Sequence, residues 1–178
     1  AWKLNLSQTN VTDDAIRPIL ELGRITELDL SDTRVTDTGV QLLAAVGSLE
    51  VLELANTPIS DQSLSAIARL TQLEVLGLNE TAITDSGLPQ LDPLHCLWCL
   101  DLDRTSINGH SLSSLKCWRT IEWLFLAHTC VDDLGLRQLR SAIHLEELWI
   151  HDTSTSDSGI SHLQAALPSC TVHRTPKY

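Results

Sequence analysis

The sequence has little positive charge, few aromatic side chains and no long apolar run. Its 178 residues include 12 Lys and Arg against 23 Asp and Glu, which gives a formal net charge of −11, and only 4% of the residues are aromatic. A nucleic acid is a polyanion and needs the opposite charge balance, so we do not expect one as a partner. No stretch of eighteen apolar residues occurs and no signal peptide is visible, so membrane insertion is not expected either.

The patterns of catalytic and cofactor sites are also missing. No nucleophile lies near a base in a recognised spacing, and there is no glycine-rich phosphate loop. The five cysteines are odd in number and scattered, which favours free thiols in a reducing, cytoplasmic compartment. Cys96 and Cys99 form a C-x-x-C pair, but structural zinc needs two converging pairs, and these residues fall in a loop and on a strand. The sequence therefore predicts no enzyme, no metal site and no cofactor.

What the sequence does contain is a period of 24 residues without insertion or deletion. Each unit has a leucine at the same place, namely Leu4, Leu28, Leu52, Leu76, Leu100, Leu124 and Leu148. Five residues later each unit has a threonine, namely Thr9, Thr33, Thr57, Thr81, Thr105, Thr129 and Thr153. A fixed period between about 20 and 50 residues is typical of a solenoid, because a single unit cannot bury its apolar face alone.

The repeated unit reads LxxLxLxxTxVTDxGLxxLxxLxx and is clearest in residues 25–48 and 73–96. It resembles the leucine-rich repeat family. Its TDxGL segment is similar to bacterial members and, more distantly, to the cysteine-containing repeats of F-box proteins, which carry Cys or Asn where this chain has Thr. The resemblance implies an α/β solenoid, a right-handed horseshoe with a concave parallel β-sheet and short convex helices, used to grip another protein. We expect seven repeats over residues 1–168 and a closing half-strand and tail over residues 169–178.

Local chemistry favours the same architecture. Apolar and polar residues alternate in segments such as LDL and LEL, which predicts short strands buried on one side. We expect the threonine hydroxyls to satisfy backbone groups of neighbouring turns. Pro18, Pro89 and Pro93 fall in the helical segments, so these helices must be short and some of them 3₁₀. In six of the units an aspartate follows the N-cap position, in the first turn, where it suits the helix dipole. Each segment begins with a preferred N-cap residue, namely Thr12, Thr36, Ser60, Thr84, Asn108, Asp132 and Ser156.

The two ends of the array differ. The first unit starts abruptly at Ala1, with no polar cap over its open edge. The segment LPSCTVHR at residues 167–174 resembles the closing half-strand of the family, with Cys170 and Val172 facing the core. We therefore expect a piece of a longer protein that is cut on its N-terminal side. The alternative is that an ordinary short N-terminus is missing.

Acidic residues gather at the positions expected to point outward from the sheet. These positions hold two bases, Lys3 and Arg104. They hold 13 of the 23 carboxylates: Glu27, Asp29, Asp32, Glu50, Glu53, Glu74, Glu80, Asp101, Asp103, Glu122, Glu146, Glu147 and Asp152. Carboxylates on adjacent strands about 5 Å apart repel one another. The functional interpretation is a field that attracts a basic partner. The alternative is a solvated face that keeps the open sheet soluble.

Aromatic residues gather on the last strands of the same face. The pattern places Trp98, Trp123, Phe125 and Trp149 close together on the sheet, whereas Trp118 falls in the apolar column of a helix and is expected in the core. Exposed aromatic rings are common anchors of protein interfaces. The alternative is that the rings pack on one another and stiffen the sheet.

His128, His151 and Asp152 are also expected to come together, on the last two strands. We interpret them as solvated residues of the face, and the two histidines could make binding change near pH 6.

The sequence thus predicts a binding module for a protein or peptide, with a basic ligand expected. The predicted contacts are Trp98, Trp123, Phe125, Trp149, Asp29, Glu53, Asp101, Asp103, His128 and His151. One alternative is a structural spacer in a larger surface or scaffold protein. Another, which follows only from the F-box resemblance, is the substrate-recruiting arm of a ubiquitin ligase.

Overall fold

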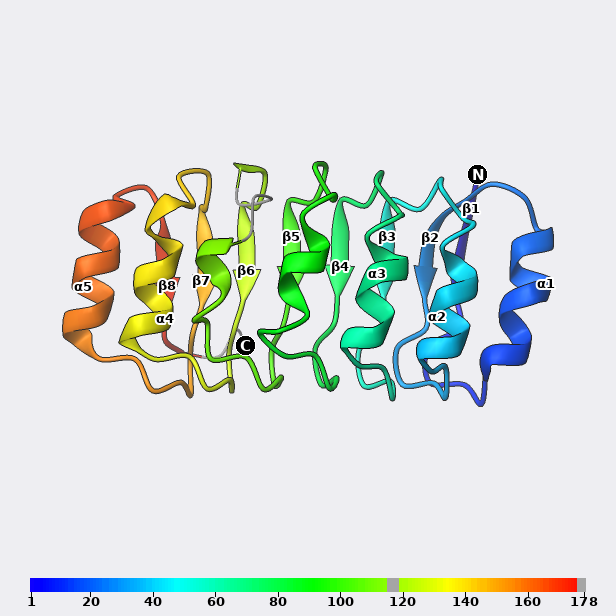
Figure 1. Cartoon of the computed structure of the whole chain (residues 1–178), viewed down its shortest axis with the longest axis horizontal. Helices are drawn as coiled ribbons and strands as arrows, with labels where there is room; N and C mark the ends of the chain where they lie inside the picture. Colours follow the sequence, from blue (N-terminus) through cyan, green and yellow to red (C-terminus); the bar gives the residue numbers. More distant parts are fainter. Residues whose placement is uncertain (115–118, 176–178) are drawn as a thin grey trace.

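The computed structural model describes residues 1–114 and 119–175. Its strands form one open, parallel sheet that follows the order of the sequence (Figure 1). The strands are β1 (Trp2–Asn5), β2 (Ile25–Asp29), β3 (Val51–Glu53), β4 (Val75–Gly77), β5 (Cys99–Asp101), β6 (Trp123–Phe125), β7 (Glu147–Trp149) and β8 (Thr171–His173).

Short helices cover one side of this sheet and leave the other side open (Figure 1). The α-helices are α1 (Ile16–Glu21), α2 (Asp37–Leu43), α3 (Leu64–Ile67), α4 (Asp133–Gln138) and α5 (Asp157–Ala166). The 3₁₀ turns are η1 (Asp13–Ala15), η2 (Asp61–Ser63), η3 (Leu88–Leu91), η4 (Leu112–Ser114) and η6 (Leu139–Ser141). The predicted solenoid of parallel strands and short, partly 3₁₀ helices is confirmed.

The strands pair in strict register because the period is constant. Leu28 lies opposite Leu52, which lies opposite Leu76, and the same column continues through later strands. These leucines are at most 1% exposed and form one continuous core with helix residues such as Val40 and Leu43. Burial of this apolar column, repeated in each coil, is the main favourable contribution to folding.

The threonine column acts within each coil and not between coils. Each hydroxyl donates to the carbonyl oxygen three residues earlier at 2.5–2.7 Å, as Thr33 does to Leu30. The expectation that these hydroxyls satisfy neighbouring turns is therefore wrong. A threonine side chain is short, and the next coil lies a full strand spacing of about 4.8 Å away, so the hydroxyl closes its own turn instead.

Aspartates join successive coils on the helix side. The carboxylate of Asp13 accepts from the backbone N–H of Thr36 at 2.8 Å and from its hydroxyl at 2.7 Å. The same pair of bonds joins Asp37 to Ser60, Asp61 to Thr84 and Asp133 to Ser156. The glycine of the repeated TDxG motif has a steric reason as well, because a Cβ added at Gly39 would clash with the Asp13 carboxylate.

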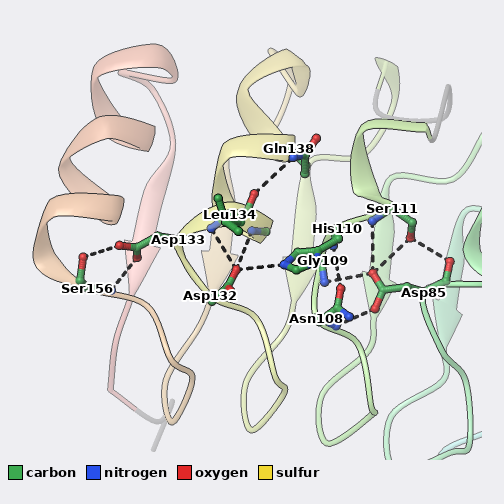
Figure 2. A network of polar contacts seen from close by, with 11 residues as sticks. Asp85, Asn108, Gly109, His110, Ser111, Asp132, Asp133, Leu134, Gln138 and Ser156 are labelled. Atoms are coloured by element: carbon green, nitrogen blue, oxygen red, sulfur yellow. Dashed lines mark hydrogen bonds and ion pairs between the residues drawn. The ribbon is translucent and has the colours of Figure 1, made fainter.

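This aspartate column is interrupted at Gly109, where the other coils have a carboxylate (Figure 2). Asp85 still reaches the backbone of Asn108, but the next contact is made by the His110 ring, which lies 3.3 Å from Asp132. The residues that follow, 115–118, include Trp118, so the prediction that this indole lies in the core falls outside the described residues.

Candidate functional site

One column of side chains runs along the open face of the sheet, and we call it the face column. Its members lie opposite one another in register: Asn5, Asp29, Glu53, Gly77, Asp101, Phe125, Trp149 and His173. The first five positions carry an amide, three carboxyls and a glycine, and the last three carry rings. The column therefore has a polar half on β1–β5 and an aromatic half on β6–β8.

Hydrogen bonds hold the ends of the polar half but not its middle. Asp29 accepts from the Asn5 amide at 3.0 Å, and Asp101 accepts from the backbone N–H of Asp103 at 2.9 Å. Glu53 extends along the face into the space that Gly77 leaves, because a Cβ added at Gly77 would lie 1.7 Å from its Oε2. Within residues 1–114 and 119–175, neither Glu53 nor Asp101 has a salt bridge.

Burial and mutual repulsion change the protonation of these carboxyls. Burial, followed by the negative charges of Asp101 and Asp29, raises the pKa of Glu53 to about 7. Burial also raises the pKa of Asp101 to about 6, and Asp103 adds to the rise despite its backbone hydrogen bond. For Asp103 burial again dominates, and the pKa rises to about 6 although the N–H of Ala127 and the Arg104 charge oppose it. Half-buried carboxyls with too few positive partners are the distinguishing feature of this half.

Two neighbouring features complete the polar half. A hollow of about 250 Å³ lies at its start, lined by Lys3, Leu4, Asn5, Glu27, Leu28, Asp29, Val51 and Glu53. Lys3 is paired with Glu27 at 2.5 Å and does not neutralise the column. Burial and the charges of Glu53 and Asp101 raise the pKa of Cys99 to about 12, so this thiol stays protonated and unreactive at neutral pH.

The aromatic half is held together by ring contacts. Phe125 and Trp149 stack with centroids 4.0 Å apart, and Trp149 stacks on His173 at 4.7 Å. Trp123 meets Trp149 edge-on at 6.1 Å and Trp98 at 5.5 Å. Trp149 is only 4% exposed as a result, whereas Trp98, Trp123 and Phe125 keep part of their surface in solvent. The rings thus pack on one another, as the alternative interpretation of the sequence has it, and three of them remain accessible.

An open groove of about 620 Å³ lies beside the accessible rings, at the start of β5–β7. It is lined by Cys96, Trp98, Arg119, Thr120, Glu122, Trp123, His144 and Glu146. Sequence reasoning did not single out Arg119 or His144, because neither falls on a strand position. It also missed His173, which the 24-residue period places in the column of Trp149 and which lies 2.5 Å from Glu147.

His128, His151 and Asp152 come together where β6 and β7 end, as predicted. The His128 Nδ1 atom lies 3.4 Å from an Asp152 oxygen, and the two imidazole rings are 5.0 Å apart and nearly perpendicular. Burial, followed by the charge of His128, lowers the pKa of His151. The Nδ1 atom of His151 is buried and has no hydrogen-bond partner among the described residues.

The comparisons with known proteins agree with this geometry. A family model described as Leucine Rich repeat matches residues 25–44 and 48–68. A leucine-rich repeat protein of Leptospira interrogans superposes with a TM-score of 0.71 at 21% identity, over 87% of this chain and 38% of that one. The chain has the fold of leucine-rich repeat proteins.

Two internalins of Listeria monocytogenes have the same leucine-rich repeat fold. InlF gives a TM-score of 0.69 at 18% identity over 97% of this chain and 53% of that one. Internalin C2 gives 0.69 at 26% identity over 94% and 69%. The chain therefore spans about four-tenths to a half of the first two proteins. A search of curated protein sequences gives no match.

Leucine-rich repeat proteins are typically interaction modules without an enzymatic activity of their own, and they bind other proteins through extended surfaces. In the part of the chain that the structure describes, no helix is both long and apolar enough to cross a membrane. Four cysteines are described, and all are free: Cys96, Cys99, Cys130 and Cys170.

Proposed function

We propose that the open face of the sheet binds a protein or peptide that carries basic residues. The observation that supports this most strongly is the group of half-buried carboxyls Glu53, Asp101 and Asp103. Burial raises their pKa values to about 6 to 7, and neighbouring carboxylates add to the rise for Glu53 and Asp101. A Lys or Arg from a partner would supply the missing positive charge, and Arg can do so with two parallel hydrogen bonds to one carboxylate. Asp29, opposite Glu53 in the face column, extends the same attraction.

The accessible rings supply the apolar part of the proposed interface. Trp98 and Trp123 line the groove at the start of β5–β7, and Phe125 lies next to Asp101 in the face column. Trp149 supports these rings from a buried position. Aromatic anchors beside a polar rim are the usual composition of a protein interface. In this proposal the chain itself performs no catalysis, and it presents a preformed surface.

The test is a selection of random peptides on the purified chain. We expect the enriched peptides to carry Lys or Arg together with an apolar residue. They should lose affinity for Asp101→Asn and for Trp123→Ala, and bind the matched control Glu21→Gln normally because Glu21 lies on the helix side. Peptides without basic enrichment that bind all three variants alike would contradict the proposal.

The alternative function, a structural spacer, is favoured by one observation. The rings of Phe125, Trp149 and His173 form a continuous stack that joins β6, β7 and β8. Such a stack stabilises the end of the array whether or not a ligand binds. A spacer would yield no peptides that discriminate the two face variants from the control, so the same selection separates the two functions.

A further inference from the structure

Three potential metal ligands lie together at the ends of β6 and β7. One ligand atom each from His128, His151 and Asp152 lies within 4.8 Å of the others. Among the described residues this is the single group of three or more His, Cys, Asp or Glu residues with such spacing. The residues come from two adjacent coils, since His128 and Asp152 are one 24-residue period apart and His151 precedes Asp152.

The distances suit a small divalent ion. Zinc bonds of roughly 2.0–2.2 Å to nitrogen and oxygen place tetrahedral ligands roughly 3.4 Å apart. His128 and Asp152 already meet this separation, with 3.4 Å between Nδ1 and the carboxylate oxygen. The second imidazole needs a shift of about 1 Å or a little more, which side-chain rotation can provide.

The backbone under these side chains is fixed on both coils. His128 and Asp152 each have a positive φ, 55° and 54°, at the same place in the repeat. The N–H of His128 donates to the carbonyl of His151 at 2.9 Å, which ties the two coils together at the cluster. Rigid supports of this kind hold ligands at a constant separation.

A second observation points to a ligand. The Nδ1 atom of His151 is buried and has no hydrogen-bond partner in residues 1–114 and 119–175, although buried polar atoms are nearly always paired. Two imidazoles and one carboxylate are a donor set that suits Zn²⁺ and its neighbours in the first transition row.

We propose that His128, His151 and Asp152 bind one divalent transition-metal ion, with Zn²⁺ as the reference ion. Three protein ligands leave a coordination position open to water or to a side chain of a partner. The site lies beside the aromatic half of the face column and does not depend on the proposed peptide binding. The 24-residue period predicts that these three residues come together, but it does not predict a metal site, because the spacing of the two histidines, 23 residues apart, matches no short metal-binding motif.

The test is a competition titration of the purified chain with Zn²⁺ and a chromophoric zinc indicator. We expect one ion per chain in the wild type, and an affinity at least about tenfold lower in His128→Ala and in Asp152→Asn. Thermal unfolding without metal shows whether these surface variants are folded. Equal affinity in the wild type and in both folded variants would overturn the proposal.

Two controls identify binding that occurs elsewhere. His110 and Asp132 form a similar pair, 3.3 Å apart, without a second histidine, so His110→Ala should bind Zn²⁺ as the wild type does. Cys96 and Cys130 are exposed thiols, and a Cys96→Ser, Cys130→Ser variant should also keep the site. Loss of the tight ion in either control would refute the assignment. In NMR spectra Zn²⁺ should shift the ring nitrogens of His128 and His151 and leave those of His110 in place.

Discussion

The two halves of the face column share one backbone and differ in what their side chains do to one another. In the polar half, burial raises the pKa values of Glu53 and Asp101 to about 7 and about 6, and the negative charges of neighbouring aspartates add to both rises. In the aromatic half, Phe125, Trp149 and His173 stack at 4.0 and 4.7 Å. The same register therefore gives repulsion in one half and cohesion in the other. The aromatic half stabilises the fold. The polar half would be stabilised more than the aromatic half by a positively charged partner.

We expect the largest loss of stability from a substitution that breaks the ring stack of the aromatic half. Trp149→Ala removes a ring that is 4% exposed and stacked on both sides, so we expect a loss of about 3–4 kcal/mol in the free energy of unfolding. Urea unfolding followed by circular dichroism measures this loss. Trp98→Ala is the matched control, because that ring is half-buried and, within residues 1–114 and 119–175, has one edge-on ring contact, with Trp123. Equal losses in the two variants would show that neither the deeper burial nor the stacking of Trp149 adds to the stability of the fold.

Removing a negative charge from the polar half should increase the stability of the fold. Glu53→Gln keeps the shape of the side chain and removes its charge, so we expect it to stabilise the fold at pH 8 by about 1 kcal/mol. This value is discounted because Glu53 is partly solvated and its interactions are screened. The control is Glu74→Gln, since Glu74 is exposed and lies outside the face column. A destabilised Glu53→Gln protein would mean that the carboxylate makes a favourable interaction.

The raised pKa values of these carboxyls predict how the stability of the fold depends on pH. The folded-state pKa values of Glu53 and Asp101 lie above their ordinary values of 4.5 and 3.8, so between about pH 4 and pH 7 the folded state binds more protons than the unfolded state. Stability from these groups is therefore present below about pH 4 and is lost as the pH rises toward 7. Melting temperatures between pH 5 and 8 should fall for the wild type, and less steeply for a Glu53→Gln, Asp101→Asn variant. Parallel curves for the two proteins would contradict the assignment.

The period of the sequence is enough to predict which residues are neighbours. Asp29 and Glu53 are 24 residues apart, and so are Phe125 and Trp149, and each pair lies opposite in the sheet. Sequence does not show which rings are covered, because the burial of Trp149 depends on how its neighbours stack and on His173. The role of Asp13 was missed for a similar reason. Its dipole position is visible in the sequence, but the bonds to Thr36 require knowledge of how closely adjacent coils approach.

The smallest effect concerns the rate at which a basic ligand arrives. Asp101→Asn removes one charge from the polar half, so we expect the association rate of a selected basic peptide to fall roughly threefold at low salt. The difference should shrink at about 0.5 M salt, because screening then acts over distances of a few ångströms. Stopped-flow fluorescence measures both rates, with Glu21→Gln as the control on the helix side. Trp123→Ala should instead raise the dissociation rate, because an apolar contact forms only after encounter. If Asp101→Asn changed only dissociation, at every salt concentration, the carboxyl would act as a direct contact in the complex and the polar half would have no role in steering the ligand.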